Sequence, residues 1–198
     1  MTRALLVVMA LPMEAQGRFE QAGIDVLYTG IGKVNAACTL TRRLAELARA
    51  GTPPSLVVNF GTAGSRRFPA GAVVACTRFE QRDMDVSGLG FDVGVTPFED
   101  VPKTIAFPSV FTALPEGTCG TGDRFENEGA GNALPWDVID MEAYALAKVC
   151  WFEGVPFACA KYVSDGADAA AAGDWQQSLA RAADAFLALY ELLERRSV

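Results

Sequence analysis

Carboxylates stand at three points where apolar runs of this sequence end, and this pattern has the clearest chemical meaning. Glu14 follows the first apolar run, Asp140 and Glu142 enter a helix from another, and Asp165 closes the last one. The 198 residues include no His, which excludes a Ser-His-Asp triad, a Cys-His dyad and a His-ligated metal. Acid–base chemistry must then run on Asp, Glu, Lys, Cys or Tyr, and the three positions favour carboxylates. The structural alternatives are a solvated helix-start acid for Glu14 and a helix cap for Ser164 or Asp165.

Three glycine-rich turns also follow apolar runs, at residues 30–32, 61–64 and 120–123. Glycines at strand ends let a ligand approach the backbone closely, so the turns predict a small-molecule pocket, with tight turns alone as the alternative. The first turn lacks the third glycine of a dinucleotide loop, and the following strand ends at Asn59 rather than at an acid. No P-loop motif is present. The sequence therefore indicates neither NAD nor another cofactor, and no metal.

Composition and charge describe a globular domain rather than a surface binder. Hydrophobic residues make up 51% and charged residues 21%, and 24 acidic against 17 basic side chains give a net charge of −7. That balance argues against nucleic-acid and membrane partners, because both need clustered cations. Five cysteines form no C-x-x-C pair, and four lie among apolar neighbours, as expected of buried thiols in a reducing cytosol. The first apolar run is short and is interrupted by Pro12, so we expect a cytoplasmic protein without a leader.

Apolar runs alternate with helical patterns along the whole chain. This alternation predicts one α/β domain over residues 1–198, with a mixed central β-sheet and helices on both of its faces. The segment 81–117 is rich in Gly, Pro and Phe, and we expect pocket-forming loops with short strands there. The expected strands are 4–9, 24–28, 56–60, 72–79, 118–121 and 157–163, and the expected helices are 15–21, 30–50, 138–152 and 174–195.

Six segments in a fixed order resemble the nucleoside phosphorylase superfamily. They are GIGKVNAA (30–37), NFGTAG (59–64), RDMDVSGLGF (82–91), TGDRFEN (121–127), VIDMEAYALAKVC (138–150) and VPFACAKYVSDGAD (155–168). Within that superfamily the chain is most similar to the 5′-methylthioadenosine/S-adenosylhomocysteine nucleosidases, from about residue 4 to residue 190. The resemblance implies a nucleoside phosphorylase-like fold and hydrolysis of the N-glycosidic bond of a purine nucleoside through a ribosyl cation-like transition state.

The resemblance also implies a role for individual residues. Asp165 matches the general acid that protonates purine N7, and Glu14 matches the acid that orients the attacking water. Lys161 stands where the nucleosidases have an Arg that helps hold this water, and a Lys supplies charge without a bidentate fork. The matched substrate-binding positions are Thr62 near the water, Phe125 and the Glu126 backbone at the base, Met141 and Glu142 at the ribose, Ser164 beside the acid, and Val86, Leu89, Phe91 and Trp175 around the 5′ substituent.

Phosphorolysis and binding without turnover are the alternatives to hydrolysis. Phosphorylases that resemble this chain carry a Gly-x-x-x-Arg loop after the first strand and an Arg before the G-T-x-G turn. Glu14 and Asn59 occupy those places here, and a carboxylate would repel phosphate but could polarise water. The Lys161 substitution leaves a nucleoside-binding protein with little turnover as a second alternative. The presence of Glu14, Glu142 and Asp165 together argues for catalysis.

The last expectation concerns assembly. Related nucleosidases are dimers in which the partner's loop helps close the 5′ pocket. The apolar segment 82–112, with Phe91, Phe98, Phe107 and Phe111, therefore predicts a homodimer joined through this segment. The competing interpretation is that these rings fold back onto their own sheet.

Overall fold

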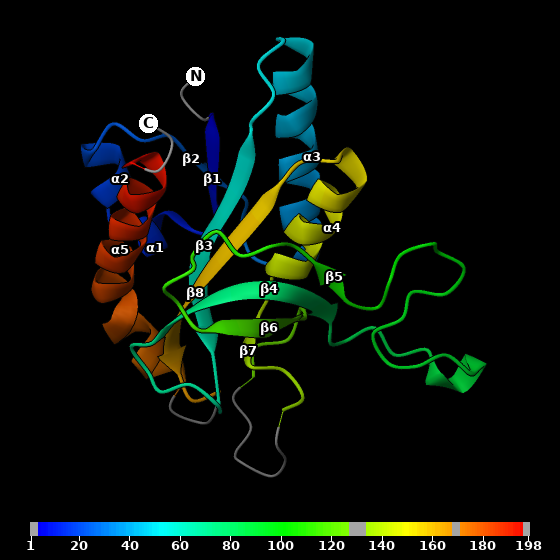
Figure 1. The fold of residues 1–198 in the computed structure, drawn as a ribbon. Coiled ribbons are helices and arrows are strands. Elements are labelled where there is room, and N and C mark those ends of the chain that lie inside the picture. Colours follow the sequence, from blue (N-terminus) through cyan, green and yellow to red (C-terminus); the bar gives the residue numbers. More distant parts are fainter. Residues whose placement is uncertain (1–3, 127–133, 168–170, 196–198) are drawn as a thin grey trace.

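The computed structural model of the protein describes residues 4–126, 134–167 and 171–195, and its centre is a set of parallel strands (Figure 1). Strand β1 (Leu5–Met9) pairs in parallel with β2 (Val26–Tyr28) and β3 (Leu56–Gly64), and β3 pairs in parallel with β8 (Phe157–Asp165). All of β8 and nearly all of β3 are buried, which explains their continuous apolar sequences.

Five of the strands pair in sequence so that they form a closed ring. Strand β8 pairs antiparallel with β4, β4 pairs in parallel with β6, and β6 pairs in parallel with β7. Strand β7 then returns to β3 in a single antiparallel pair, Gly64 with Ile139. The sheet is mixed, as predicted, but its strands β3, β8, β4, β6 and β7 form a closed circuit. The remaining bounds are β4 (Val73–Gln81), β5 (Ile105–Ala106), β6 (Glu116–Thr121) and β7 (Val138–Asp140).

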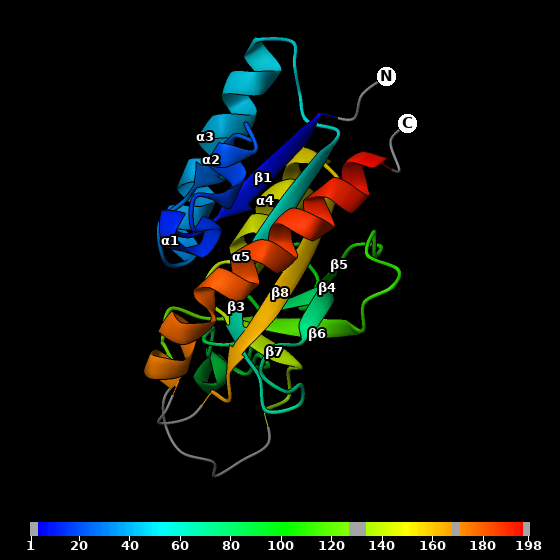
Figure 2. The same cartoon turned by 90° about the vertical axis from the view of Figure 1, so that its left-hand side faces the viewer.

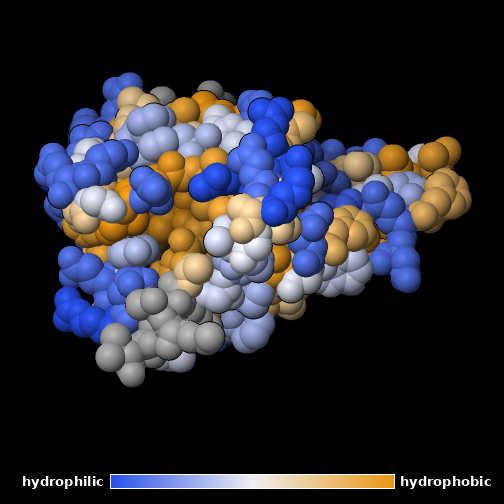
Figure 3. Space-filling view, turned by 90° about the horizontal axis from the view of Figure 1, so that it is seen from above, coloured by the Kyte–Doolittle hydropathy of each residue, from blue (hydrophilic) through white to orange (hydrophobic). Residues whose placement is uncertain are grey.

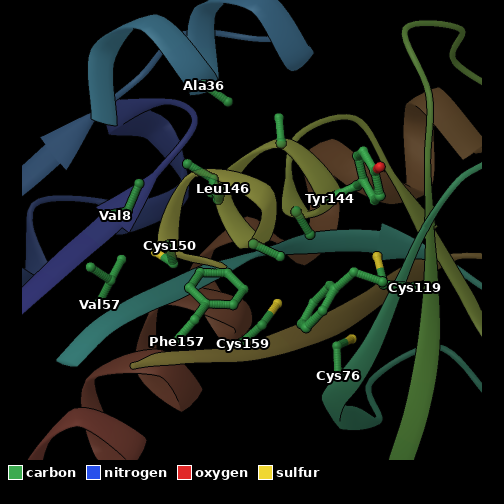
Figure 4. Close-up of a cluster of buried hydrophobic side chains, with 14 of the residues drawn as sticks. Val8, Ala36, Val57, Cys76, Cys119, Tyr144, Leu146, Cys150, Phe157 and Cys159 are labelled. Carbon is green, nitrogen blue, oxygen red and sulfur yellow. The ribbon is translucent and has the colours of Figure 1, made fainter. Parts of the chain in front are cut away.

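Helices cover both faces, which confirms the predicted fold class. On one face α3 (Lys33–Arg49) packs against α4 (Ala143–Glu153), and in Figure 4 Cys150 of α4 lies beside Phe157 of β8. On the other face α5 (Ala171–Arg195) lies diagonally across β3 and β8 beside the short helices α1 (Pro12–Ala15) and α2 (Arg18–Gln21) (Figure 2). Cys76, Cys150 and Cys159 are buried as predicted from their apolar neighbours. Cys119 is also buried, whereas Cys38 is exposed and so departs from the expectation of buried thiols.

Two expected helices are corrected by the structure. The segment 138–152 begins as strand β7, because Val138–Asp140 pair with β6, and α4 starts only at Ala143, whose N–H donates to the Asp140 carboxylate at 2.8 Å. The expected helix 15–21 is split into α1 and α2, because Gln16 and Gly17 both have left-handed backbone, with φ of 48° and 69°. The first break follows from pairing with a distant strand and the second from local backbone conformation, and an apolar pattern reveals neither.

Residues 84–104, here called the arm, include the loop that projects from the body of the protein (Figures 1 and 3). The arm holds only the 3-10 turn Ser87–Leu89, and its Phe98 side chain is 95% exposed. Phe107 and Phe111 behave differently, because Phe107 packs edge-on against Phe157 and Phe111 is buried beside Phe60. The four Phe residues expected at an interface are thus divided between an exposed arm and the core.

No helix in the described part of the chain combines the length and the apolar character that a bilayer crossing needs.

The glycine-rich turns were expected to let a ligand approach the backbone. Three of their glycines instead make room for side chains of the protein itself. A Cβ on Gly120 would lie 2.4 Å from Cδ2 of Trp136, and a Cβ on Gly122 would lie 2.9 Å from Cγ of Arg82. A Cβ on Gly61 would lie 2.9 Å from Nζ of Lys161. Each distance is shorter than a Cβ atom tolerates, so an added side chain would force its neighbour to move. The rigid Trp136 ring makes this requirement for glycine strongest at Gly120.

Gly120→Ala is therefore expected to destabilise the protein, because the added methyl group overlaps the Trp136 ring. Overpacking of this kind costs about 1–3 kcal/mol in the free energy of unfolding. Gly88→Ala is the matched control, since a Cβ there meets nothing within 4 Å, and its effect should stay within about 1 kcal/mol. Urea denaturation followed by circular dichroism measures both. Equal stability of the two variants would contradict the packing argument.

Candidate active site

A cavity of about 220 Å³ lies where β1, β3, β7 and β8 end. This is the edge at which open α/β sheets bind their ligands. The residues that line the cavity include apolar side chains, several acids and two arginines. Its members are Ala10, Leu11, Glu14, Ile31, Thr62, Ala63, Gly64, Arg82, Arg124, Phe125, Glu126, Ile139, Asp140, Met141, Glu142, Ser164, Asp165 and Trp175.

Glu14 is fixed by four hydrogen-bond donors from two strand ends. Its Oε2 accepts from the backbone N–H groups of Ala10 and Leu11, both at 3.2 Å. Its Oε1 accepts from Thr62, through the backbone N–H at 3.0 Å and the hydroxyl at 3.1 Å. Glu14 is only 4% exposed. The solvated helix-start interpretation is therefore wrong, because helix α1 turns this carboxylate back onto the ends of β1 and β3.

Asp165 ends β8 in an equally defined environment. Ser164 Oγ donates to its Oδ2 at 2.7 Å, and the Ala167 N–H donates to its Oδ1 at 2.9 Å. The register between β3 and β8 shifts after Ala63, which places Asp165 opposite Gly64. A Cβ on Gly64 would lie 2.8 Å from Asp165 Oδ1, so the missing side chain provides the space for this carboxyl group. Ser164 lines the cavity and also holds Asp165.

Glu142 faces the cavity from the turn between β7 and α4. The Gly32 N–H donates to its Oε1 at 2.8 Å, which connects this carboxyl group to the turn before α3. Burial, and then the charge of Asp140, raises the pKa of Glu142 to about 8. The Lys161 ammonium opposes this rise. These surroundings favour the protonated form of Glu142 more than water does.

Lys161 and Asp140 form a buried ion pair below the cavity. Lys161 Nζ lies 2.8 Å from Asp140 Oδ2, and both side chains are at most 2% exposed. Although burial acts the other way, the Lys161 charge holds the pKa of Asp140 below its usual range, and the Asp140 charge raises the pKa of Lys161. Asp140 also accepts from Thr121 Oγ1 at 2.6 Å. Lys161 is not among the residues that line the cavity, and its ammonium is bound to Asp140. A direct contact between Lys161 and the attacking water stays a prediction.

The loop after β6 carries Phe125 and Glu126 into the cavity and is tied down by Arg82. Arg82 Nη1 donates to Glu126 Oε1 at 2.8 Å, and Nη2 donates to the Arg124 carbonyl. The Arg82 side chain is 8% exposed and lies against Gly122. The sequence analysis missed Arg82 as a cavity residue, although it follows β4 directly and so stands at a strand end, as the predicted acids do.

Of the residues expected around a 5′ substituent, only Trp175 lies in the cavity of this chain. Val86, Leu89 and Phe91 belong to the arm, which projects away from the sheet. Phe91 packs edge-on against Phe98, with ring centroids 5.6 Å apart. These three residues are not among those that line the cavity of their own chain. The other nine predicted site residues are Glu14, Thr62, Phe125, Glu126, Met141, Glu142, Ser164, Asp165 and Trp175, and the structure brings them together.

Within the described ranges, no group of three or more Cys, Asp or Glu side chains is arranged to hold a metal ion.

Known proteins with similar sequences include several that are named as nucleosidases. The profile of the family described as "Phosphorylase superfamily" matches residues 15–194. The 5′-methylthioadenosine/S-adenosylhomocysteine nucleosidase of Marinomonas sp. (strain MWYL1) is 34% identical over 170 residues, covering 75% of this chain and 71% of that protein. The protein of the same name from Haemophilus ducreyi is 31% identical over 188 residues, covering 85% and 78%.

Solved structures with the same fold include two kinds of nucleoside hydrolase. The 5′-methylthioadenosine/S-adenosylhomocysteine nucleosidase of Neisseria meningitidis, in complex with methylthio-immucillin-A, gives a TM-score of 0.77 at 25% identity, covering 91% of this chain and 93% of that one. The futalosine hydrolase of Helicobacter pylori gives 0.77 at 21% identity, covering 92% and 93%, and this likeness shows the fold alone. Because the superfamily profile covers most of the chain and the nucleosidases align over more than two thirds of their length, the chain belongs to the phosphorylase superfamily.

Proposed function

We propose that the protein hydrolyses the N-glycosidic bond of a purine nucleoside, with 5′-methylthioadenosine, S-adenosylhomocysteine or a related nucleoside as substrate. The observation that carries this proposal is the convergence of Glu14, Glu142 and Asp165 from three separate strand ends on one cavity. The names of the aligned relatives support the same activity. A binding protein needs a shaped pocket, whereas three carboxyl groups at different places suit a reaction in which protons move and positive charge develops.

Each carboxyl group has one role in the proposed reaction. Asp165 donates a proton to N7 of the purine, so that the bond between C1′ and the base breaks and the base leaves as a neutral molecule. Glu142 binds the ribose hydroxyls through charge-assisted hydrogen bonds. Glu14 orients a water whose oxygen bonds to C1′, and it accepts the proton that this water loses. The negative charges around the ring stabilise the ribosyl cation-like transition state.

Hydrolysis is favoured over phosphorolysis by the charges near Glu14. Phosphate needs cations or free backbone N–H groups. The N–H groups of Ala10, Leu11 and Thr62 at this end of the cavity all donate to Glu14. The nearby ammonium of Lys161 is paired with Asp140. A phosphate placed here would meet a carboxylate whose surrounding donors are already used.

Asp165→Asn should lower kcat by about 10²–10⁴-fold with little change in KM, because an amide fits the site but has no proton to give. Release of free adenine from methylthioadenosine, with and without phosphate, measures the rate. The exposed Asp25→Asn is the matched control and should keep full activity. An unchanged kcat in Asp165→Asn would remove this residue from the mechanism. Strict dependence on phosphate would mean phosphorolysis, and saturable binding without adenine release would mean a binding protein.

Glu142 predicts a pH dependence. Its pKa of about 8 in the free protein means that the carboxylate form, which accepts from the ribose hydroxyls, becomes the major form as the pH rises through that value. The kcat/KM of the wild type should therefore rise between about pH 6 and about pH 9, since this parameter reports the free enzyme. Glu142→Gln should remove that rise and reduce the preference for ribosides over 2′-deoxyribosides. A wild-type profile that falls across this range would contradict the assignment.

We also propose that the protein is a cytoplasmic homodimer joined through the arm. Its five cysteines are all free, which suits a reducing compartment. Leu89, Val93 and Phe98 are exposed on the arm, with 71%, 40% and 95% of their surface accessible. Apolar patches of this kind mark interfaces, and a two-fold pair is the commonest closed assembly. Phe107 and Phe111 are left out of the proposed surface because they pack in their own core.

Leu89→Ser combined with Phe98→Ser should convert the dimer to a monomer, because both changes remove apolar contacts from the arm without touching the core. Light scattering coupled to size exclusion at micromolar concentration measures the mass. Phe152→Ser changes a 61% exposed Phe on α4 and is the matched control. A monomeric wild type with full activity would overturn the proposed assembly, and a dimer that survives the double substitution would exclude the arm as its interface.

A further inference from the structure

A chain of two hydrogen bonds connects the start of α5 to Glu14. The indole N–H of Trp175 donates to Thr62 Oγ1 at 2.9 Å, and the Thr62 hydroxyl lies 3.1 Å from Glu14 Oε1. Trp175 is itself held at its backbone, where its carbonyl accepts from Ser178 Oγ at 2.8 Å. Three elements therefore meet at one hydroxyl group: α5 through Trp175, β3 through Thr62 and α1 through Glu14.

The direction of these hydrogen bonds follows from the chemistry of the groups. An indole N–H can only donate, so Thr62 Oγ1 must accept from Trp175. Both oxygens of Glu14 already accept from backbone N–H groups, those of Ala10 and Leu11 at Oε2 and that of Thr62 at Oε1. A carboxylate can only accept, so the Thr62 hydroxyl proton points at Glu14 Oε1. Without the indole, the hydroxyl could rotate and donate elsewhere.

We propose that Trp175 is a positioning residue for the hydrolytic step, acting through Thr62 on the carboxylate that orients the water. The inference rests on the proposed role of Glu14 and adds a role for the indole N–H, which is separate from the cover that the Trp175 ring gives to the cavity. Glu14 Oε1 accepts from both the backbone N–H and the hydroxyl of Thr62, and Trp175 keeps the hydroxyl in its orientation. A rotated Thr62 hydroxyl would leave this oxygen with one donor and a less defined direction toward the water.

The two roles of Trp175 can be separated by substitution. Trp175→Phe keeps an aromatic ring over the cavity but removes the donor, so kcat should fall by about three- to tenfold while KM changes by less than about twofold. Thr62→Val removes the hydroxyl at nearly constant volume and should lower kcat at least as much. Trp151→Phe, a half-exposed indole on α4, is the matched control and should leave both parameters unchanged.

The double variant is the decisive measurement. If Trp175 acts only through the hydroxyl, Trp175→Phe in the Thr62→Val protein should produce no further loss of kcat. Losses that multiply would show that Trp175 acts independently of Thr62 and would overturn the inference. The same conclusion would follow from a Trp175→Phe enzyme with wild-type kcat, or from one whose loss lies entirely in KM.

Two further readouts keep this inference distinct from the proposed function. Glu14→Gln should abolish hydrolysis, and full activity in that variant would overturn the proposed function together with the inference. The hydrogen bond itself can be tested without turnover, because the Trp175 indole N–H gives a proton–nitrogen NMR signal that is absent in Trp175→Phe. Its exchange with solvent should be faster in Thr62→Val than in the wild type. Equal exchange rates would mean that the hydroxyl does not bind the indole, and the inference would then be wrong.

Discussion

The ion pair between Lys161 and Asp140 is the interaction on which the cavity depends. Strands β7 and β8 bring two opposite charges together below the cavity, where both are almost fully excluded from water. Removing one partner of such a pair typically costs about 3–5 kcal/mol, because the other charge stays buried without compensation. Asp140 also accepts from Thr121 and from the first N–H of α4, so the same carboxylate fixes the end of β6 and the beginning of that helix.

This pair also governs the acidity of its neighbour. Glu142 lies two residues after Asp140, and the negative charge of Asp140 is one of the causes that raise its pKa. Lys161, which is paired with Asp140, moderates the effect because its positive charge lowers the pKa of Glu142. In the proposed mechanism, the Lys161 charge therefore influences ribose binding by lowering the pKa of Glu142. It needs no contact with the substrate to do so.

The fold class and the cavity edge could be predicted because they depend on local patterns. A polar residue at the end of a buried strand faces the edge of the sheet, and this places Glu14 and Asp165 at the same edge before any contact is known. The short strand β7 was not predictable in this way, because Val138–Asp140 is too short to show an alternating pattern and runs into an apolar helix. Its identity depends on pairing with β6.

Parts of the site could not be predicted from the sequence, because several of its side chains are held by residues that are distant in the chain. Lys161 and Asp140 each carry a charge inside an apolar segment, and only the folded structure shows that their side chains meet. Arg82 is similar, since the carbonyl and carboxylate that hold its guanidinium belong to a loop about 40 residues away. The path of the arm was also hidden, because a segment rich in Gly, Pro and Phe can fold back or project with the same composition.

The position of β8 in the ring has a consequence for biosynthesis. Strand β8 lies between β3 and β4. Its Cys159 Sγ donates a hydrogen bond to Oδ1 of Asn59, which is 100 residues earlier in the chain. Until residue 165 has left the ribosome, the facing edges of β3 and β4 lack their partner, and unpaired edges of this kind are prone to aggregation. Contacts between such distant residues also make folding slow. The carboxylate Asp165 arrives with the same strand, so a nascent chain has to keep two open sheet edges apart until the segment that completes its cavity is synthesised.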